Sequence, residues 1–203
     1  MQKIRNIGNI AAISLAMVVF LTACGGKDLT KTDATSVTVK KDGSVINVIF
    51  EDFSEGYYNI DELKNMAEDE VNAYNAQNGE SKAELTSLER EDSNIKMVMK
   101  FASASDYTSF NSEQLMFGTV SELKLSGVNV DTNLVDTNGV PVSSEDIAGI
   151  LDDQHVLVTE NKGLVALPYK VKYTSKGVSL TDSSVADLSQ TAEGELTYIV
   201  LGK

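Results

Sequence analysis

Short apolar segments separated by tight-turn residues limit most strongly what this 203-residue chain can fold into. Residues 36–40 and 44–50 are rich in β-branched side chains and flank Lys41-Asp42-Gly43. The Asp-Gly pair supplies the positive φ that a tight hairpin turn needs, so this stretch predicts two antiparallel strands. Strands joined by short turns favour antiparallel sheets over parallel ones.

The same pattern continues to the C-terminus. Further strands are predicted over residues 83–90, 95–101, 115–117, 155–160, 164–167, 169–174, 178–181 and 196–201. Turns are predicted at 91–94, 138–139, 161–163 and 175–177. The sequence has no internal repeat of fixed period, so these strands are predicted to form one set of hairpins.

One long amphipathic helix is predicted over about 60–77. Asn59 can cap its first turn, with Glu62 placed three residues later, and Gly79 ends it. Its apolar residues recur every three to four positions, at Ile60, Leu63, Ala67, Val71 and Tyr74. Short helices are expected at 103–111, 121–124 and 143–151. The predicted class is therefore α+β: antiparallel sheets built from hairpins, one main amphipathic helix and a few short helices.

The N-terminus has the pattern of a secretion signal. Lys3 and Arg5 precede an apolar run over residues 10–21, and residues 1–23 contain no acidic side chain. A run of 12 residues is typical of a signal-peptide core and is too short for a bilayer, which needs roughly 20. Because no other segment could span a membrane, we expect a protein that is anchored rather than embedded.

The run ends at Leu21-Thr22-Ala23-Cys24, which resembles the bacterial lipobox. That resemblance implies cleavage between Ala23 and Cys24 and a diacylglyceryl group on the Cys24 thiol. Cys24 is the single cysteine of the chain, so it has no disulfide partner. Lipidation explains its position better than an unmodified exported thiol does, and lipid chains on one residue give stable anchoring.

These signals divide the chain. Residues 1–23 are predicted as signal peptide, 24–35 as the lipidated N-terminus with a flexible tether, and 36–203 as an extracytoplasmic α+β domain. A break near Gly127 would divide that domain into two subdomains, and one continuous domain is the favoured alternative. The expected location is the extracytoplasmic face of the cell membrane.

The charge of the chain excludes anionic partners. Lys3 and Arg5 are the only charges removed with the signal, so 17 basic residues fall to 15 against 30 acidic ones, a net charge of −15. A domain this acidic repels nucleic acid, anionic headgroups and anionic wall polymers. We therefore expect no nucleic-acid partner.

The chain resembles a family of hypothetical lipoproteins from anaerobic Gram-positive bacteria. The matching segments are Val39-Lys40-Lys41-Asp42-Gly43, Glu51-Asp52-Phe53, Tyr57-Tyr58-Asn59 with Asp61-Glu62-Leu63, Phe117-Gly118-Thr119, residues 169–173 and Tyr198-Ile199-Val200. They are short and span nearly the whole chain. The resemblance implies a lipid anchor and a single-membrane cell, and it implies no activity.

Catalytic and metal-binding patterns are scarce. His155 is the single histidine and opens an apolar strand, so it is interpreted as a locally bonded strand-edge residue. One histidine and a lipidated cysteine exclude the usual zinc sites. The oxygen-rich stretch 131–139 lacks the glycine and glutamate positions of an EF-hand loop, which leaves a pair of turns or a weak calcium site. No cofactor and no catalytic residue is predicted.

Tyr57 and Tyr58 lie just ahead of the long helix, where they could face a ligand or pack onto Leu63 as a hydrophobic staple. The sequence favours a non-catalytic, membrane-anchored domain that binds a protein or an envelope component. Two alternatives stay open: a small envelope hydrolase that uses two carboxylates, and a purely structural lipoprotein. No spacing identifies a catalytic pair among the 30 acidic residues.

Overall fold

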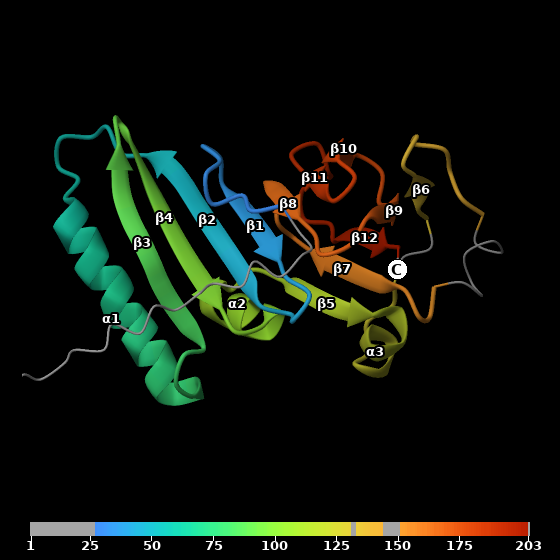
Figure 1. Ribbon diagram of the computed structural model, residues 1–203, viewed down its shortest axis with the longest axis horizontal. Coiled ribbons are helices and arrows are strands. Elements are labelled where there is room, and N and C mark those ends of the chain that lie inside the picture. Colours follow the sequence, from blue (N-terminus) through green and yellow to red (C-terminus); the bar gives the residue numbers. More distant parts are fainter. Residues whose placement is uncertain (1–26, 131–132, 144–150, 203) are drawn as a thin grey trace, which may run out of the picture.

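The computed structural model describes residues 27–130, 133–143 and 151–202. Within these ranges the chain forms a seven-stranded sheet, a five-stranded sheet and three helices, arranged along one long axis (Figure 1). The predicted α+β class is confirmed, including the single long helix. The signal, the lipobox residues and most of the helix expected at 143–151 lie outside the described residues.

The seven-stranded sheet consists mainly of the predicted hairpins. In spatial order its strands are β10 (Ser179–Asp182), β11 (Val185–Asp187), β8 (Leu164–Ala166), β1 (Ser36–Val39), β2 (Val45–Asp52), β4 (Asn94–Phe101) and β3 (Ala83–Glu91). Gly43, with φ of 82°, closes the β1–β2 turn as predicted. One pair departs from the antiparallel pattern, because β1 runs parallel to β8 with Ser36 opposite Leu164.

The five-stranded sheet is antiparallel throughout. Its order is β5 (Leu115–Thr119), β7 (His155–Thr159), β12 (Thr197–Leu201), β9 (Val171–Thr174) and β6 (Val135–Asp136). The side chains of its central strands alternate between two apolar clusters. Leu157 and Ile199 join the larger cluster, whereas Val156 and Val200 join a second one beneath α3 (Val120–Leu125).

The larger cluster connects the two sheets. It contains Val37 and Phe101 of the seven-stranded sheet together with Leu157 and Leu201 of the five-stranded one, all fully buried. Residues before and after Gly127 therefore share one core. Burial of this kind is the main stabilising contribution in a domain of this size.

Helix α1 (Ile60–Asn78) lies beside the edge strand β3 at one end of the molecule (Figure 1). Ala67 and Val71 are buried against the sheet, whereas Glu68 is exposed, so the predicted faces of the helix are correct. The Asn59 side chain accepts hydrogen bonds from the backbone N–H groups of the first turn. Helix α2 (Ala104–Asn111) begins at the cap Ser103 and packs near β5.

The segment 27–35 differs from the predicted flexible tether. Leu29 is buried in a small cluster with Ala166 and Val185, and the Lys27 ammonium lies 2.6 Å from the Asp182 carboxylate. A single apolar residue gives no periodic signal, which is why the sequence indicates a solvated chain here. From Lys27 onward this segment is part of the folded body.

Among the described residues, no helix has both the length and the apolar character needed to cross a bilayer.

Candidate functional site

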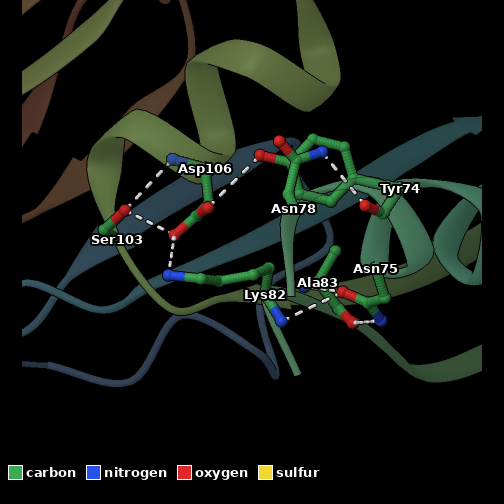
Figure 2. A network of polar contacts seen from close by, with 7 residues as sticks. All are labelled: Tyr74, Asn75, Asn78, Lys82, Ala83, Ser103 and Asp106. Atoms are coloured by element: carbon green, nitrogen blue, oxygen red, sulfur yellow. Dashed lines mark hydrogen bonds and ion pairs between the residues drawn. The ribbon is translucent and has the colours of Figure 1, made fainter. Parts of the chain in front are cut away.

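A network of polar contacts joins α1, the start of β3 and the start of α2 (Figure 2). The Asn75 side chain accepts hydrogen bonds from the backbone N–H groups of Lys82 and Ala83, at 3.0 and 2.9 Å. It also donates to the Ala83 carbonyl at 2.8 Å. One amide side chain therefore satisfies three backbone groups where the helix returns to the sheet.

Asp106 is the centre of the other half of this network. It is 8% exposed, and it accepts hydrogen bonds from the hydroxyls of Ser103, at 2.5 Å, and Tyr74, at 3.3 Å. The Lys82 ammonium lies 3.8 Å away. Ser103 caps α2, and its hydroxyl donates a hydrogen bond to the Asp106 carboxylate. Because Tyr74 of α1 bonds the same carboxylate, Asp106 ties the cap of α2 to α1. We assign this network to fold stability.

A groove of about 590 Å³ runs between the segment 27–35 and the strands β3 and β4. Its lining residues are Thr30, Lys31, Asp33, Thr86, Ser87, Glu89, Glu91, Lys96 and Val98. Lys96 lies 2.8 Å from Asp33 and 3.1 Å from Glu91, and its ammonium is 5.6 Å from the centre of the Phe50 ring. The hydrogen bond to Asp33 raises the pKa of Lys96. Three charged groups of this groove, Lys96, Asp33 and Glu91, are therefore paired with each other.

His155 begins β7, as predicted, and two aromatic rings pack against it. Its imidazole is 5.5 Å from the Phe117 ring and 4.9 Å from the Tyr169 ring, measured between centroids. Lys41, in the β1–β2 turn, places its ammonium 5.4 Å from the centre of the same Tyr169 ring. His155 therefore packs between the Phe117 ring of β5 and the Tyr169 ring that precedes β9.

An exposed aromatic group stands at the end of the seven-stranded sheet where β2 leaves for α1. We call Phe53, Tyr57, Tyr58 and Arg90 the aromatic tip. The Tyr58 ring is stacked on the Phe53 ring at 4.8 Å and 21°, and Tyr57 meets Tyr58 edge-on at 4.7 Å and 67°. Phe53 is 7% exposed, whereas Tyr57 is 76% exposed and Tyr58 41%.

The tip is held from the sheet side by Arg90 of β3. The Arg90 guanidinium lies 5.7 Å from the centre of the Phe53 ring and donates to the Phe53 carbonyl at 3.2 Å. It also donates to the Asp92 carbonyl at 3.1 Å. The exposed tyrosines therefore rest on a buried ring whose residue is held by the Arg90 cation and by one hydrogen bond from Arg90 to its carbonyl.

The surroundings of the tip are acidic. Between positions 51 and 62 the chain carries Glu51, Asp52, Glu55, Asp61 and Glu62 and no basic residue, and all five carboxylates are exposed. Hydrogen bonding with Tyr57 raises the pKa of Tyr58, and the carboxylates of Glu55 and Asp52 act in the same direction. The rings thus project from a surface of negative potential.

The structure describes the predicted oxygen-rich stretch around Asp136 in part and does not describe the predicted lipobox. Leu21, Thr22, Ala23 and Cys24 lie outside the described residues, so their predicted roles stay predictions. In the oxygen-rich stretch, the Asp136 carboxylate accepts hydrogen bonds from the N–H groups of Val140 and Asn138, which lower its pKa. Over residues 27–130, 133–143 and 151–202, no three His, Cys, Asp or Glu side chains gather closely enough to hold a metal ion.

Sequence reasoning identified half of the tip. Tyr57 and Tyr58 stood out as adjacent aromatics ahead of a helix cap, and the structure stacks Tyr58 on Phe53. Arg90 was missed because its contact with Phe53, 37 positions away, leaves no local pattern, and Phe53 was missed with it. Comparison with known proteins finds no matching family model, no matching curated protein and no matching solved structure.

Proposed function

We propose that this protein is a lipid-anchored, extracytoplasmic binding module that holds a protein or another envelope component at the aromatic tip. The apolar run and lipobox at residues 10–24 support the anchor. The anchor would leave the folded body on the outer face of the cell membrane. The proposed activity is binding without catalysis.

The single observation that carries the binding part is the exposure of two tyrosines on a rigid base. Tyr57 and Tyr58 present large apolar area to solvent. Phe53, on which Tyr58 stacks, is buried instead. Tyrosine is enriched at the energetic centres of protein interfaces because it offers large area at low conformational cost. A surface of this kind is adapted to contact with a partner.

The other chemically rich groups support the same choice. Asp106 and Asn75 are engaged in joining helices to the sheet, and Lys96, Asp33 and Glu91 of the groove are paired with each other. None of them presents an uncommitted side chain to a substrate in the way that the tip presents its rings.

Photo-crosslinking in living cells tests this proposal. A photoreactive phenylalanine analogue is placed at position 57 of the full-length chain, and at position 70 as a control, where Glu70 is exposed on α1. We expect discrete adducts in the membrane fraction from position 57 and none of the same mass from position 70. Identical adduct patterns from both positions, or no adduct from position 57, would contradict binding at the tip.

A further inference from the structure

The aromatic tip is a row of groups that already contains one bound cation. Arg90 contacts Phe53, Phe53 stacks with Tyr58, and Tyr58 meets Tyr57. The inner end of the row is thus occupied by a guanidinium of the chain itself. At the outer end, Tyr57 is 76% exposed.

Ring–cation contacts recur elsewhere in this acidic protein. Lys41 lies over Tyr169, Lys96 over Phe50 and Lys172 over Tyr173, at 5.1 to 5.6 Å from the ring centres. Each aromatic ring of this kind attracts a cation through its negative face. At the tip the basic residue is Arg90, and its two hydrogen bonds to backbone carbonyls direct it inward to the Phe53 side.

The carboxylates around the tip increase this attraction. Asp52 ends β2 opposite Asn94, so the acidic stretch 51–62 adjoins the β3–β4 turn with its own Glu91 and Asp92. The lysine closest in sequence, Lys64, lies 3.9 Å from Glu68 on α1. Such a surface repels anionic lipid and wall polymers and attracts positively charged segments.

We infer that the aromatic tip docks a basic segment of a partner protein, with a lysine or arginine side chain of the partner on the ring of Tyr57 and neighbouring basic groups facing Asp52 and Glu55. This inference rests on the proposed function, since it names the chemistry of the partner at the same surface. The rings supply the site of contact, and the carboxylates supply rate of association and selectivity against acidic partners.

Binding of a defined peptide to the full-length chain in neutral detergent tests the inference. The probe is a fluorescent nine-residue peptide of alternating arginine and glycine, and its uncharged counterpart carries citrulline in place of arginine. We expect the arginine peptide to bind and the citrulline peptide to bind at least tenfold more weakly. Tyr57→Ala should weaken the arginine peptide about threefold, the size of an exposed cation–π contact.

A pair of charge-matched variants separates the tip from the general acidity of the protein. Asp52→Asn with Glu55→Gln removes two carboxylates at the tip, and Glu193→Gln with Glu195→Gln removes two exposed ones before β12. We expect the first pair to weaken binding about fivefold and the second less than twofold. Equal weakening by both pairs, or no effect of Tyr57→Ala, would overturn the inference.

The two proposals fail in different ways. Adducts from position 57 in cells, together with no binding of the arginine peptide, would leave the binding module standing and exclude a basic partner. Tighter binding of a glutamate-rich peptide than of the arginine peptide would have the same meaning. Absence of adducts from position 57 would instead contradict the proposed function itself.

Discussion

The ammonium of Lys96 on β4 lies 2.8 Å from the carboxylate of Asp33, and this contact joins the segment 27–35 to the seven-stranded sheet. If the lipid is attached at Cys24, as proposed, three peptide units separate it from Lys27. A fully extended chain of that length spans about 11 Å. The folded body would therefore lie close to the membrane surface, with little freedom to move away from it.

Breaking this contact should loosen the segment without unfolding the domain. Asp33→Asn removes one of the two carboxylates that bind Lys96, so the amide of Thr32, bonded to the Leu29 carbonyl at 3.0 Å, should exchange with deuterium several times faster. Glu68→Gln, which removes the exposed pair with Lys64, is the control and should leave that amide unchanged. Unaltered exchange at Thr32 in Asp33→Asn would show that the ion pair does not hold the segment.

The same pair has a defined pH dependence. The pKa of Lys96 is raised above its ordinary value of 10.5, first by the hydrogen bond to Asp33. A raised pKa means that the folded state binds the proton more tightly, so the stabilisation is complete below pH 10.5 and is lost as the pH rises through the raised value. Thermal melting should therefore separate wild type from Lys96→Gln below pH 10 and converge in strong alkali. Equal separation at every pH would contradict this assignment.

Asn75 should be among the most sensitive polar residues. Asn75→Ala removes the partner of two backbone N–H groups and one carbonyl, and half-buried groups of this kind cost about 1–3 kcal/mol when they lose their bonds. Denaturant titration should show a loss of about 2 kcal/mol. Asn78→Ala removes an exposed bond to the Tyr74 carbonyl and should cost no more than about 0.5 kcal/mol. Equal losses would mean that the joint between α1 and β3 is unimportant.

The buried face of α1 gives a second stability test. Val71→Asp places a charge in the core beside Ala67 and should cost roughly 3 kcal/mol or more. Glu68→Gln, on the exposed face, should change the free energy of unfolding by no more than about 0.5 kcal/mol. Chemical denaturation of both variants measures the difference, and similar values would show that the helix packs by another face.

The stretch around Asp136 tests the alternative of a calcium site. Its carboxylate is occupied by the N–H groups of Val140 and Asn138, so millimolar calcium should leave the melting temperature of the protein unchanged. The pKa of Asp136 is lowered, so its stabilisation is present above the ordinary value of 3.8 and is lost as the pH falls through the lowered one. Asp136→Ala should therefore be less stable than wild type at pH 7 and converge with it in acid. A clear rise in melting temperature with calcium would favour the cation site instead.

Local signals account for what the sequence predicted. The Asp42-Gly43 turn, the cap at Asn59 and the apolar period of α1 each depend on residues a few positions apart, and all three are found in the structure. The parallel pairing of β1 with β8 was not predicted, because it depends on a contact between residues 128 positions apart, Ser36 and Leu164. The strand β11 was missed since three residues, flanked by serines and an aspartate, carry no period.

The candidate site divides in the same way. Tyr57 and Tyr58 are adjacent in sequence, so their position before a helix drew attention to them. Their support depends on Arg90 reaching Phe53 across the sheet, which only the tertiary structure determines. The packing of Leu29 beside Ala166 is equally long-range, and it converts part of an expected tether into folded structure.

Lipid modification of Cys24 is the central proposal for this protein, because it would hold an exported chain at the membrane. Metabolic labelling of producing cells with a palmitate analogue tests this directly, comparing wild type with Cys24→Ala. We predict strong labelling of the wild type in the membrane fraction, and for Cys24→Ala no label and release from that fraction. Equal labelling of the two proteins, or an unlabelled wild type, would contradict the lipid anchor and with it the proposed placement of the aromatic tip outside the cell.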